Sequence, residues 1–245
     1  MSGHSKWKTI ARKKGETDAK RANLFTKLSR EIIVAVKEGG GGDPNNNARL
    51  RDAIAKARAG NVPSDNIKRV IDRAAGSADG SSYEQNTYEG YGPSGVAVIV
   101  ETMTDNRNRT ASDVRHYFDK YGGNLGAAGC VSWSFDKKGV LLIDAENLDE
   151  DTVLEAALEC GAEDFSSESG EDGAIFEVLT SPDEFGAVRE ALERKGYSFV
   201  SAQIEMVPQN YQTLGDPEDV KKMEKLLEML DDNDDVQNVW HNWEE

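Results

Sequence analysis

The 245-residue chain is poor in the residues that mark several common protein classes. Its two cysteines, Cys130 and Cys160, match neither a zinc site nor a redox motif, so we expect free thiols and a cytoplasmic protein. No stretch approaches the roughly 18 consecutive apolar residues of a membrane span. The three histidines (His4, His116 and His241) are dispersed, and no nucleophile elbow, metalloprotease motif or catalytic triad pattern is present. We therefore expect no enzyme, no cofactor, no metal and no small-molecule substrate.

Two segments imitate ligand-binding motifs without meeting their structural requirements. Residues 90–95 match G-x-G-x-x-G, but they precede an apolar β-like run instead of following one, and they contain Pro93. We interpret them as a turn. Residues 231–235 are rich in carboxylates, yet an EF-hand loop begun at Asp231 would require Gly and Glu where the chain has Val236 and Asn242. We expect a solvated acidic turn there.

The charge is divided sharply along the chain. Residues 1–75 contain 17 Lys and Arg against 8 Asp and Glu, a net of +9, whereas residues 76–245 contain 12 against 37, a net of −25; together these give −16. An organelle transit peptide is the less favoured reading of the basic start, because Glu16 and Asp18 come early in it. A basic end on an acidic protein favours a nucleic-acid partner that is bound from one end only.

The basic part reads as helical. Residues 1–16 lack apolar periodicity and predict a mobile arm. Apolar residues recur every four positions from Leu24 to Val36, which predicts an amphipathic helix over 19–37. The breaker cluster at 39–44 ends it, and further helices are expected at 48–59 and 64–75. These predict an all-α basic domain over residues 1–78.

The remainder alternates strands and helices after a linker-like segment at 77–86. We expect strands at 96–100, 131–135, 140–143, 164–167, 174–179, 199–207 and 236–240, with a turn at 137–139. We expect helices at 110–121, 149–160 and 217–230, and one that begins at 181–184. The elements from 140 to 207 follow the βαββαβ order of a ferredoxin-like fold. The flanking pieces cannot bury their apolar faces alone. We therefore expect an α+β multidomain protein in which residues 79–131 and 207–245 form one discontinuous α+β domain, interrupted by a ferredoxin-like domain at 132–206.

The candidate nucleic-acid-binding residues are basic or aromatic side chains of the helical part. They are Lys6, Trp7, Lys8, Arg12, Lys13, Lys14, Lys20, Arg21, Lys27, Arg30, Arg49 and Arg51. In the predicted first helix, Lys20, Lys27 and Arg30 lie off the apolar stripe. The ring of Trp7, in the predicted arm, could stack on an exposed base. A solvated basic face is the alternative. Arg58, Lys68, Arg69 and Arg73 would serve if the second and third helices formed a helix-turn-helix.

A second cluster comprises Asn106, Arg107, Asn108 and Arg109 at a predicted strand-to-helix junction. Backbone N–H groups at such a junction favour an anion, so these residues are candidates for a phosphate-binding or functional loop. A polar loop that only caps the helix is the alternative.

Several blocks of sequence resemble the YebC family. They are residues 3–7, 18–21, 25–27, 42–44, 47–51, 88–93, 105–110, 122–126 and 234–239. The resemblance covers nearly the whole chain, with a departure at Cys130, where Ser would be expected. It implies three domains, one all-α and two α+β, with the ferredoxin-like one inserted in its neighbour.

The resemblance also implies a regulator of gene expression. The family is catalogued as probable transcriptional regulators that bind DNA, and its mitochondrial relatives resemble the translational activator of cytochrome c oxidase. Bacterial members are tied to relief of ribosome stalling at proline-rich stretches. We expect a ribosome- or rRNA-associated translation factor, with a DNA-binding transcriptional regulator as the alternative. An enzyme that uses a nucleotide would need a phosphate-loop motif, and this sequence has none, so we favour that class least.

Overall fold

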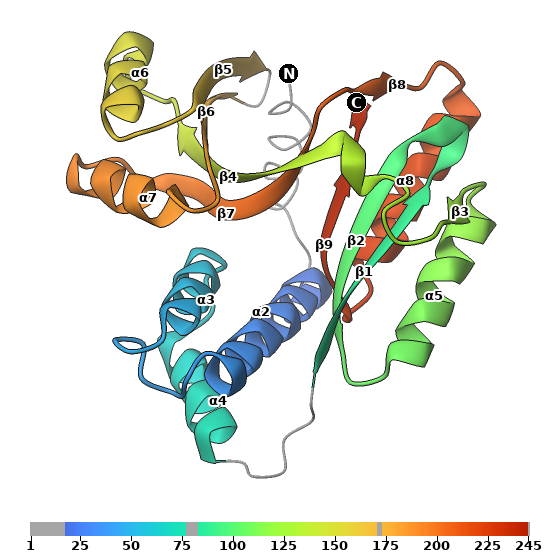
Figure 1. Cartoon of the computed structure of the whole chain (residues 1–245), viewed down its shortest axis with the longest axis horizontal. Coiled ribbons are helices and arrows are strands. Elements are labelled where there is room, and N and C mark those ends of the chain that lie inside the picture. Colours follow the sequence, from blue (N-terminus) through green and yellow to red (C-terminus); the bar gives the residue numbers. More distant parts are fainter. Residues whose placement is uncertain (1–17, 77–82, 171–172, 245) are drawn as a thin grey trace. The chain divides into compact units, whose positions relative to one another are not determined.

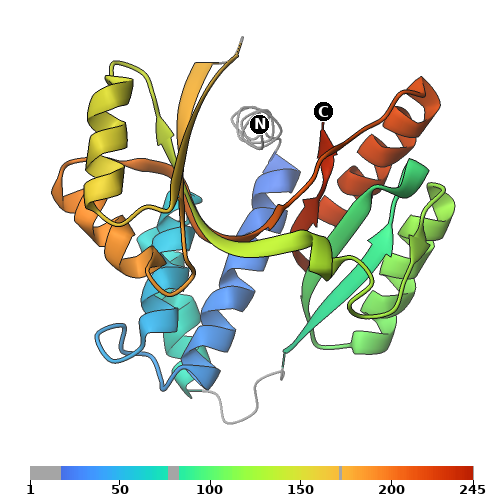
Figure 2. The same cartoon turned by 45° about the horizontal axis from the view of Figure 1, so that its top comes forward.

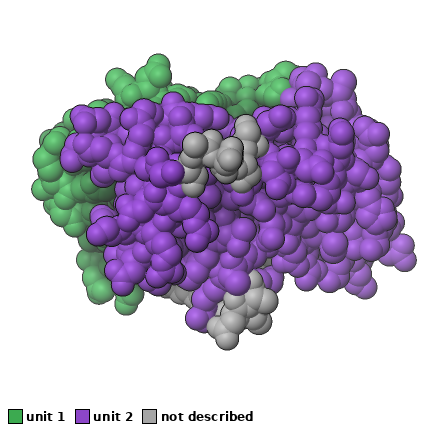
Figure 3. Space-filling model, turned by 90° about the horizontal axis from the view of Figure 1, so that it is seen from below, with its two compact units in different colours: residues 1–15, 132–213, 242–245 green, residues 16–131, 214–241 purple. Residues whose placement is uncertain are grey.

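The structure is a computed structural model that describes residues 18–76, 83–170 and 173–244 (Figure 1). The predicted mobile arm lies outside these residues. The described chain divides into two compact units: unit 1 contains residues 132–213 and 242–244, and unit 2 contains residues 18–131 and 214–241 (Figure 3). Within the described ranges, no helix has the length and apolar character needed to cross a bilayer.

Three helices form the start of unit 2: α2 (Asp18–Glu38), α3 (Ala48–Ala59) and α4 (Ser64–Gly76). The apolar stripe of α2 packs against the inner faces of α3 and α4, and the shared core includes Leu28, Ile32 and Leu50. Asn47 joins two of the helices because its Oδ1 accepts from Leu50 N at the start of α3, while its Nδ2 donates to Ala35 O in α2. Its side chain is buried, so the chain reversal at 39–47 is held from inside.

An antiparallel sheet completes unit 2, with strand order β3-β1-β2-β9. Its strands are β1 (Glu84–Tyr91), β2 (Ala97–Thr104), β3 (Asn124–Leu125) and β9 (Val236–His241), and the short 3-10 helix η1 (Pro93–Gly95) joins β1 to β2. Helices α5 (Arg107–Lys120) and α8 (Pro217–Asp231) contact this sheet and each other. Residues 90–95 therefore end a strand and form a turn, as the sequence predicts, whereas β1 overlaps the predicted linker.

Unit 1 is a second antiparallel sheet, with strand order β5-β6-β4-β7. It contains β4 (Phe135–Asp144), α6 (Glu150–Glu159), β5 (Asp164–Gly170), β6 (Gly173–Thr180), α7 (Phe185–Arg194) and β7 (Phe199–Pro208). This is the βαββαβ order with the first strand next to the third and fourth, as in a ferredoxin-like fold. Both helices pack on the sheet face that carries Leu141, Ile143 and Phe176 (Figure 2). The short strands β8 (Gln212–Thr213) and β10 (Trp243–Glu244) pair in parallel and form a separate two-stranded sheet.

The predicted turn at 137–139 is wrong. The Lys-Lys-Gly sequence at 137–139 is not a turn between two strands but the middle of the continuous strand β4, and residues 132–134 form the 3-10 helix η2 (Ser132–Ser134). Gly139 is in the strand because of packing: a Cβ there would lie 2.2 Å from Thr180 Oγ1 and 2.6 Å from Phe185 Cδ2. The glycine marks a close approach of β4 to the end of β6 and to the start of α7, and sequence alone does not distinguish this from a turn.

The fold class itself is confirmed: a helical region is followed by two α+β domains, one of which interrupts the other in the sequence. We propose that the helices at 18–76 and the discontinuous α+β part are separate domains that pack together within unit 2.

Candidate nucleic-acid interface and the Asp235 centre

The predicted binding residues fall into three groups. Lys6, Trp7, Lys8, Arg12, Lys13 and Lys14 lie outside the described residues. Lys27 and Arg30 are half-buried and face the α8–β9 loop of the same unit. Lys20, Arg21, Arg49 and Arg51 are exposed on the helices.

One polar face of α2 docks on the loop between α8 and β9. Asn23, Lys27 and Arg30 are spaced four and three residues apart and so share a face of the helix. Asn23 Nδ2 donates to Asp232 O at 2.8 Å and Lys27 Nζ donates to Asp231 O at 2.5 Å. Lys27, and Arg30 through the contacts described next, therefore bind the acidic loop and are poor candidates for contacts to phosphate.

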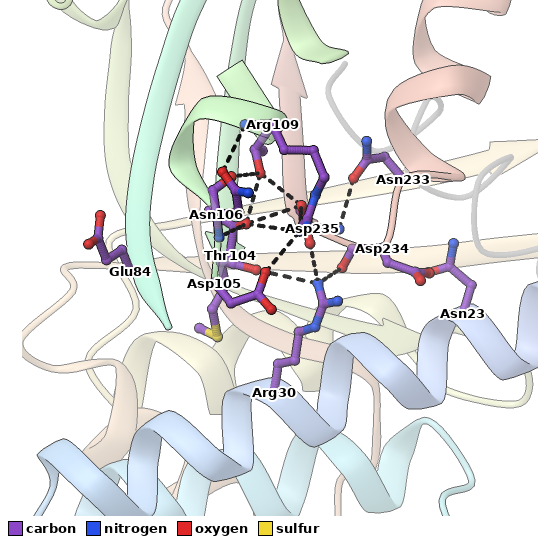
Figure 4. Close-up of polar contacts among 12 residues, drawn as sticks. Asn23, Arg30, Glu84, Thr104, Asp105, Asn106, Arg109, Asn233, Asp234 and Asp235 are labelled. Carbon is purple, nitrogen blue, oxygen red and sulfur yellow. Dashed lines mark hydrogen bonds and ion pairs between the residues drawn. The ribbon is translucent and has the colours of Figure 1, made fainter. Parts of the chain in front are cut away.

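Asp235 is the centre of this contact. It is only 4% exposed, and its carboxylate accepts hydrogen bonds from four side chains (Figure 4). Arg30 Nη1 lies 2.8 Å from Oδ1, while Arg109 Nη2 and Thr110 Oγ1 both lie 2.7 Å from Oδ2, with Thr104 Oγ1 at 3.1 Å. Arg30 Nη1 also donates to the backbone oxygen of Asp234. The expectation of a solvated acidic turn is wrong for this residue, since two guanidinium groups and two hydroxyls enclose it.

The electrostatics of the centre follow from this enclosure. Burial alone would raise the pKa of Asp235, but hydrogen bonds from Arg109 and Thr110, with the charge of Arg30, outweigh it and hold the pKa below its ordinary value. The same contact raises the pKa of Arg109. The carboxylate is therefore ionised and binds a helix of the N-terminal region to the start of α5.

The loop at the start of α5 has divided roles. Asn106 caps the helix, because its Oδ1 accepts from Arg109 N at 3.1 Å. Arg109 also reaches Asp105 Oδ1 at 3.0 Å, so its charge is used inside the protein. Arg107 and Asn108 are exposed. Burial raises the pKa of Tyr88, an effect that the nearby charge of Arg107 opposes. Of the four loop residues, Asn106 thus caps the helix and Arg109 forms internal ion pairs, while Arg107 and Asn108 stay exposed.

The exposed cations of α3 and α4 form the cationic helical surface, which we define as Arg51, Arg58, Lys68, Arg69 and Arg73. Arg51 and Arg58 are seven residues apart and share one face of α3. Neither they nor Lys68 makes an ion pair or hydrogen bond within the described chain.

Other cations of the helices are neutralised. Arg49 is held by Glu38 at 2.6 Å and by Gln85, while Lys56 pairs with Glu31. Residues 18–76 nonetheless contain 12 Lys and Arg against 7 Asp and Glu, a net of +5. The sequence singled out Arg58 and Lys68 only through a possible helix-turn-helix, and their lack of ion pairs within the described residues depends on side-chain geometry.

A second buried carboxylate supports the glycine-rich segment after α5. Glu89 is 7% exposed, and its two oxygens accept from Gly129 N at 2.8 Å and Val131 N at 2.9 Å. Tyr91 Oη donates to Cys130 O at 3.0 Å. Burial and the charge of Glu89 raise the pKa of the Cys130 thiol. These contacts fix the backbone that leads out of unit 2.

No metal centre is evident within the described ranges, where no group of three or more His, Cys, Asp or Glu side chains is placed to hold an ion. The candidate interface therefore consists of exposed cations, and the buried carboxylates Asp235 and Glu89 have structural roles. The protein has a basic helical end and two acidic α+β domains.

Comparison with known proteins gives this architecture a family. Residues 5–77 match the model "TACO1/YebC protein N-terminal domain", and residues 83–243 match "TACO1/YebC second and third domain". The chain belongs to the TACO1/YebC family.

Similar proteins match over their full lengths. A protein of Caldicellulosiruptor bescii named "probable transcriptional regulatory protein" is 58% identical, over 100% of this chain and 99% of the relative. One of the same name from Acetivibrio thermocellus is 55% identical, over 99% of both chains. The solved structure of a conserved hypothetical protein from Aquifex aeolicus is 47% identical, with a TM-score of 0.83 over 94% of this chain and 92% of that one.

Proposed function

We propose that this protein is a non-enzymatic, nucleic-acid-binding regulator of gene expression that acts in the cytoplasm. The relatives' names place the family among regulators. The observation that carries the binding function is the cationic helical surface, where Arg51, Arg58 and Lys68 are exposed without a neutralising carboxylate among the described residues. Phosphate contacts supply most of the affinity in sequence-independent recognition of nucleic acids.

We further propose that the target is rRNA on the ribosome and that the protein relieves stalling there, for example at proline-rich stretches. The charge division supports this: a protein with a net charge of −16 approaches a polyanion favourably only through its basic end. On a ribosome, the acidic domains can face a cavity or a protein surface.

The alternative is a DNA-binding transcriptional regulator, which the relatives' names favour. In a helix-turn-helix the first residues of the second helix enter the major groove. The corresponding helix, α4, has Asp65 in its first turn, where a carboxylate would oppose the approach to phosphates. This feature disfavours helix-turn-helix docking of α4 in the major groove of duplex DNA.

The experiment that separates the two is a binding comparison at physiological salt. The full chain is sedimented with purified ribosomes, and its retention on duplex DNA from its own promoters is measured in parallel. We expect co-sedimentation with ribosomes and weak, sequence-independent retention on DNA. Ribosome-free fractions together with tight, sequence-specific retention would establish the transcriptional alternative instead.

A further inference from the structure

The sheet of unit 1 is buried on both faces, although its two helices pack on only one. Helices α6 and α7 share a core with Leu141, Ile143 and Phe176 on that face (Figure 2). Yet residues 139–143 of β4 and 175–178 of β6 are buried without alternation. An antiparallel sheet with one solvated face would alternate buried and exposed side chains. The second face of this sheet is therefore also shielded from water.

The second face has an aliphatic centre and two carboxylates. We call it the acidic sheet face and define it as Val140, Leu142, Ile175, Glu177 and Glu205. Its three aliphatic residues are each 1% exposed, and the apolar cluster that they form within the described chain draws its members from β4, β6 and β7. Glu177 lies opposite Leu142 in the register and is 3% exposed. Glu205 is 5% exposed and shares this face of β7 with Gln203, which lies opposite Val140.

The carboxylates of this face select for positive charge. Glu205 Oε1 accepts from Gln203 Nε2 at 2.9 Å, and that donor is neutral. Lys138 lies opposite Glu205 in the register, and its ammonium group is 2.7 Å from Glu163 Oε2. Removing an ionised carboxylate from water is costly, and a cation beside it offsets part of that cost. The segment that complements this face therefore combines apolar side chains with Lys or Arg.

Residues 1–16 of the same chain have this composition. They contain 5 Lys and Arg against 1 Glu, a net of +4, together with Trp7 and Ile10. Residues 132–213 contain 5 Lys and Arg against 19 Asp and Glu, a net of −14, so unit 1 attracts a basic segment and repels phosphate. The same face of a second copy would repeat this negative charge. A segment tethered to the same chain also reaches an effective concentration on the order of millimolar. Charge and tether thus favour this segment over a nucleic acid or a second copy.

We infer that residues 6–14 dock on the acidic sheet face, with Trp7 and Ile10 against its aliphatic centre and the cations of the segment beside Glu177 and Glu205. These cations are Lys6, Lys8, Arg12, Lys13 and Lys14. The interaction goes beyond the proposed function, which the cationic helical surface carries without residues 6–14. The protein's own carboxylates hold these cations until a polyanion competes for them, so docking sets how much of the segment is available to nucleic acid.

A photo-crosslink tests where the segment binds. The aromatic crosslinker p-benzoylphenylalanine replaces Trp7 in the full chain, and an equal mixture of isotope-labelled and unlabelled protein is irradiated without nucleic acid. We expect crosslinks from position 7 to peptides of β4, β6 or β7 within one chain. The absence of crosslinks to these strands would overturn the proposal. Crosslinks that join labelled to unlabelled chains would also overturn it, because they would assign the face to a second copy.

Trypsin measures how strongly the segment is held, because a protease cuts the released segment and not the docked one. Cleavage after Arg12 should be about three- to tenfold faster in Glu177→Gln/Glu205→Gln than in the wild type. The control Glu155→Gln/Glu190→Gln removes the same charge at exposed positions on α6 and α7. It should be cleaved at the wild-type rate.

A second variant keeps the test valid if the carboxylate variant does not fold, which circular dichroism would show. Trp7→Ala/Ile10→Ala changes no residue of unit 1 and should also speed this cleavage by about three- to tenfold. Equal cleavage rates in the wild type, in both variants and in the control would contradict docking. Arg51→Glu/Arg58→Glu separates the inference from the proposed function, because it should weaken ribosome binding and leave the cleavage rate unchanged.

Discussion

Replacing Asp235 with asparagine tests whether the buried carboxylate joins the helical region to the α+β part of unit 2. Asparagine keeps the size and shape of the side chain and removes only its charge. Arg30 and Arg109 then face a neutral group, and one amide nitrogen replaces an oxygen that accepts hydrogen bonds. The two guanidinium groups lose their shared counter-ion.

The expected cost follows from burial. Removing one partner of a buried ion pair typically costs about 3–5 kcal/mol, because the remaining charge is left uncompensated. Asp235 is buried, with a side-chain exposure of 6%, and Arg30 is at 15%, but Arg109 is at 47% and can recover hydration. We therefore expect about 3 kcal/mol, at the lower end of the range. For a chain of this length this corresponds to a fall in Tm of about 6–12 °C for unit 2.

Scanning calorimetry of the full chain measures this change, since two compact units can give separate transitions. Asp234→Asn is the matched control, because Asp234 is exposed and only its backbone oxygen contacts Arg30. The control should change stability by less than about 0.5 kcal/mol. If Asp235→Asn were as stable as the control, the carboxylate would not be the link that we describe.

Three further outcomes follow from buried groups. Because the folded pKa of Asp235 is depressed, its stabilisation should be present above about pH 4 and lost as the pH falls through the folded pKa, so acid titration of unfolding should be flatter in Asp235→Asn than in the wild type. Glu89→Ala leaves two backbone N–H groups without acceptors and should speed hydrogen exchange at 129–131; unchanged protection would contradict this role. Gly139→Ala should destabilise unit 1 by about 1–3 kcal/mol through overpacking, whereas Gly186→Ala, in open space on α7, should not, as urea unfolding would show.

Periodicity and breakers predicted most of the fold. The apolar stripe of α2 and the glycines around it located the helices, and the βαββαβ order located the ferredoxin-like domain. The strand β1 was missed because its sequence, from Glu84 to Tyr91, is polar and resembles a linker. Its position depends on pairing with β2 and β3, which are distant interactions that local propensity does not encode.

The candidate site was less accessible from sequence. The charge pattern identified the basic helices, but it could not separate cations that are exposed to solvent from cations that pair with carboxylates or carbonyl oxygens of the same chain. Lys27 and Arg30 contact residues more than 200 positions away in the chain, so only the tertiary fold reveals their role. The same holds for Asp235, whose acidic neighbours suggest a solvated turn while its own side chain is enclosed.

The salt dependence of ribosome binding tests the central claim most directly. The full chain is titrated with purified ribosomes at several salt concentrations and compared with Arg51→Glu/Arg58→Glu and with the control Arg194→Glu/Lys221→Glu, which makes the same change of charge at exposed positions outside the helical region. The account predicts that ribosome binding by the wild type and by the control depends strongly on salt. Arg51→Glu/Arg58→Glu should bind more weakly, and its slope of log K against log salt should be shallower by about one to two units. Equal affinities and equal slopes for all three proteins would contradict it.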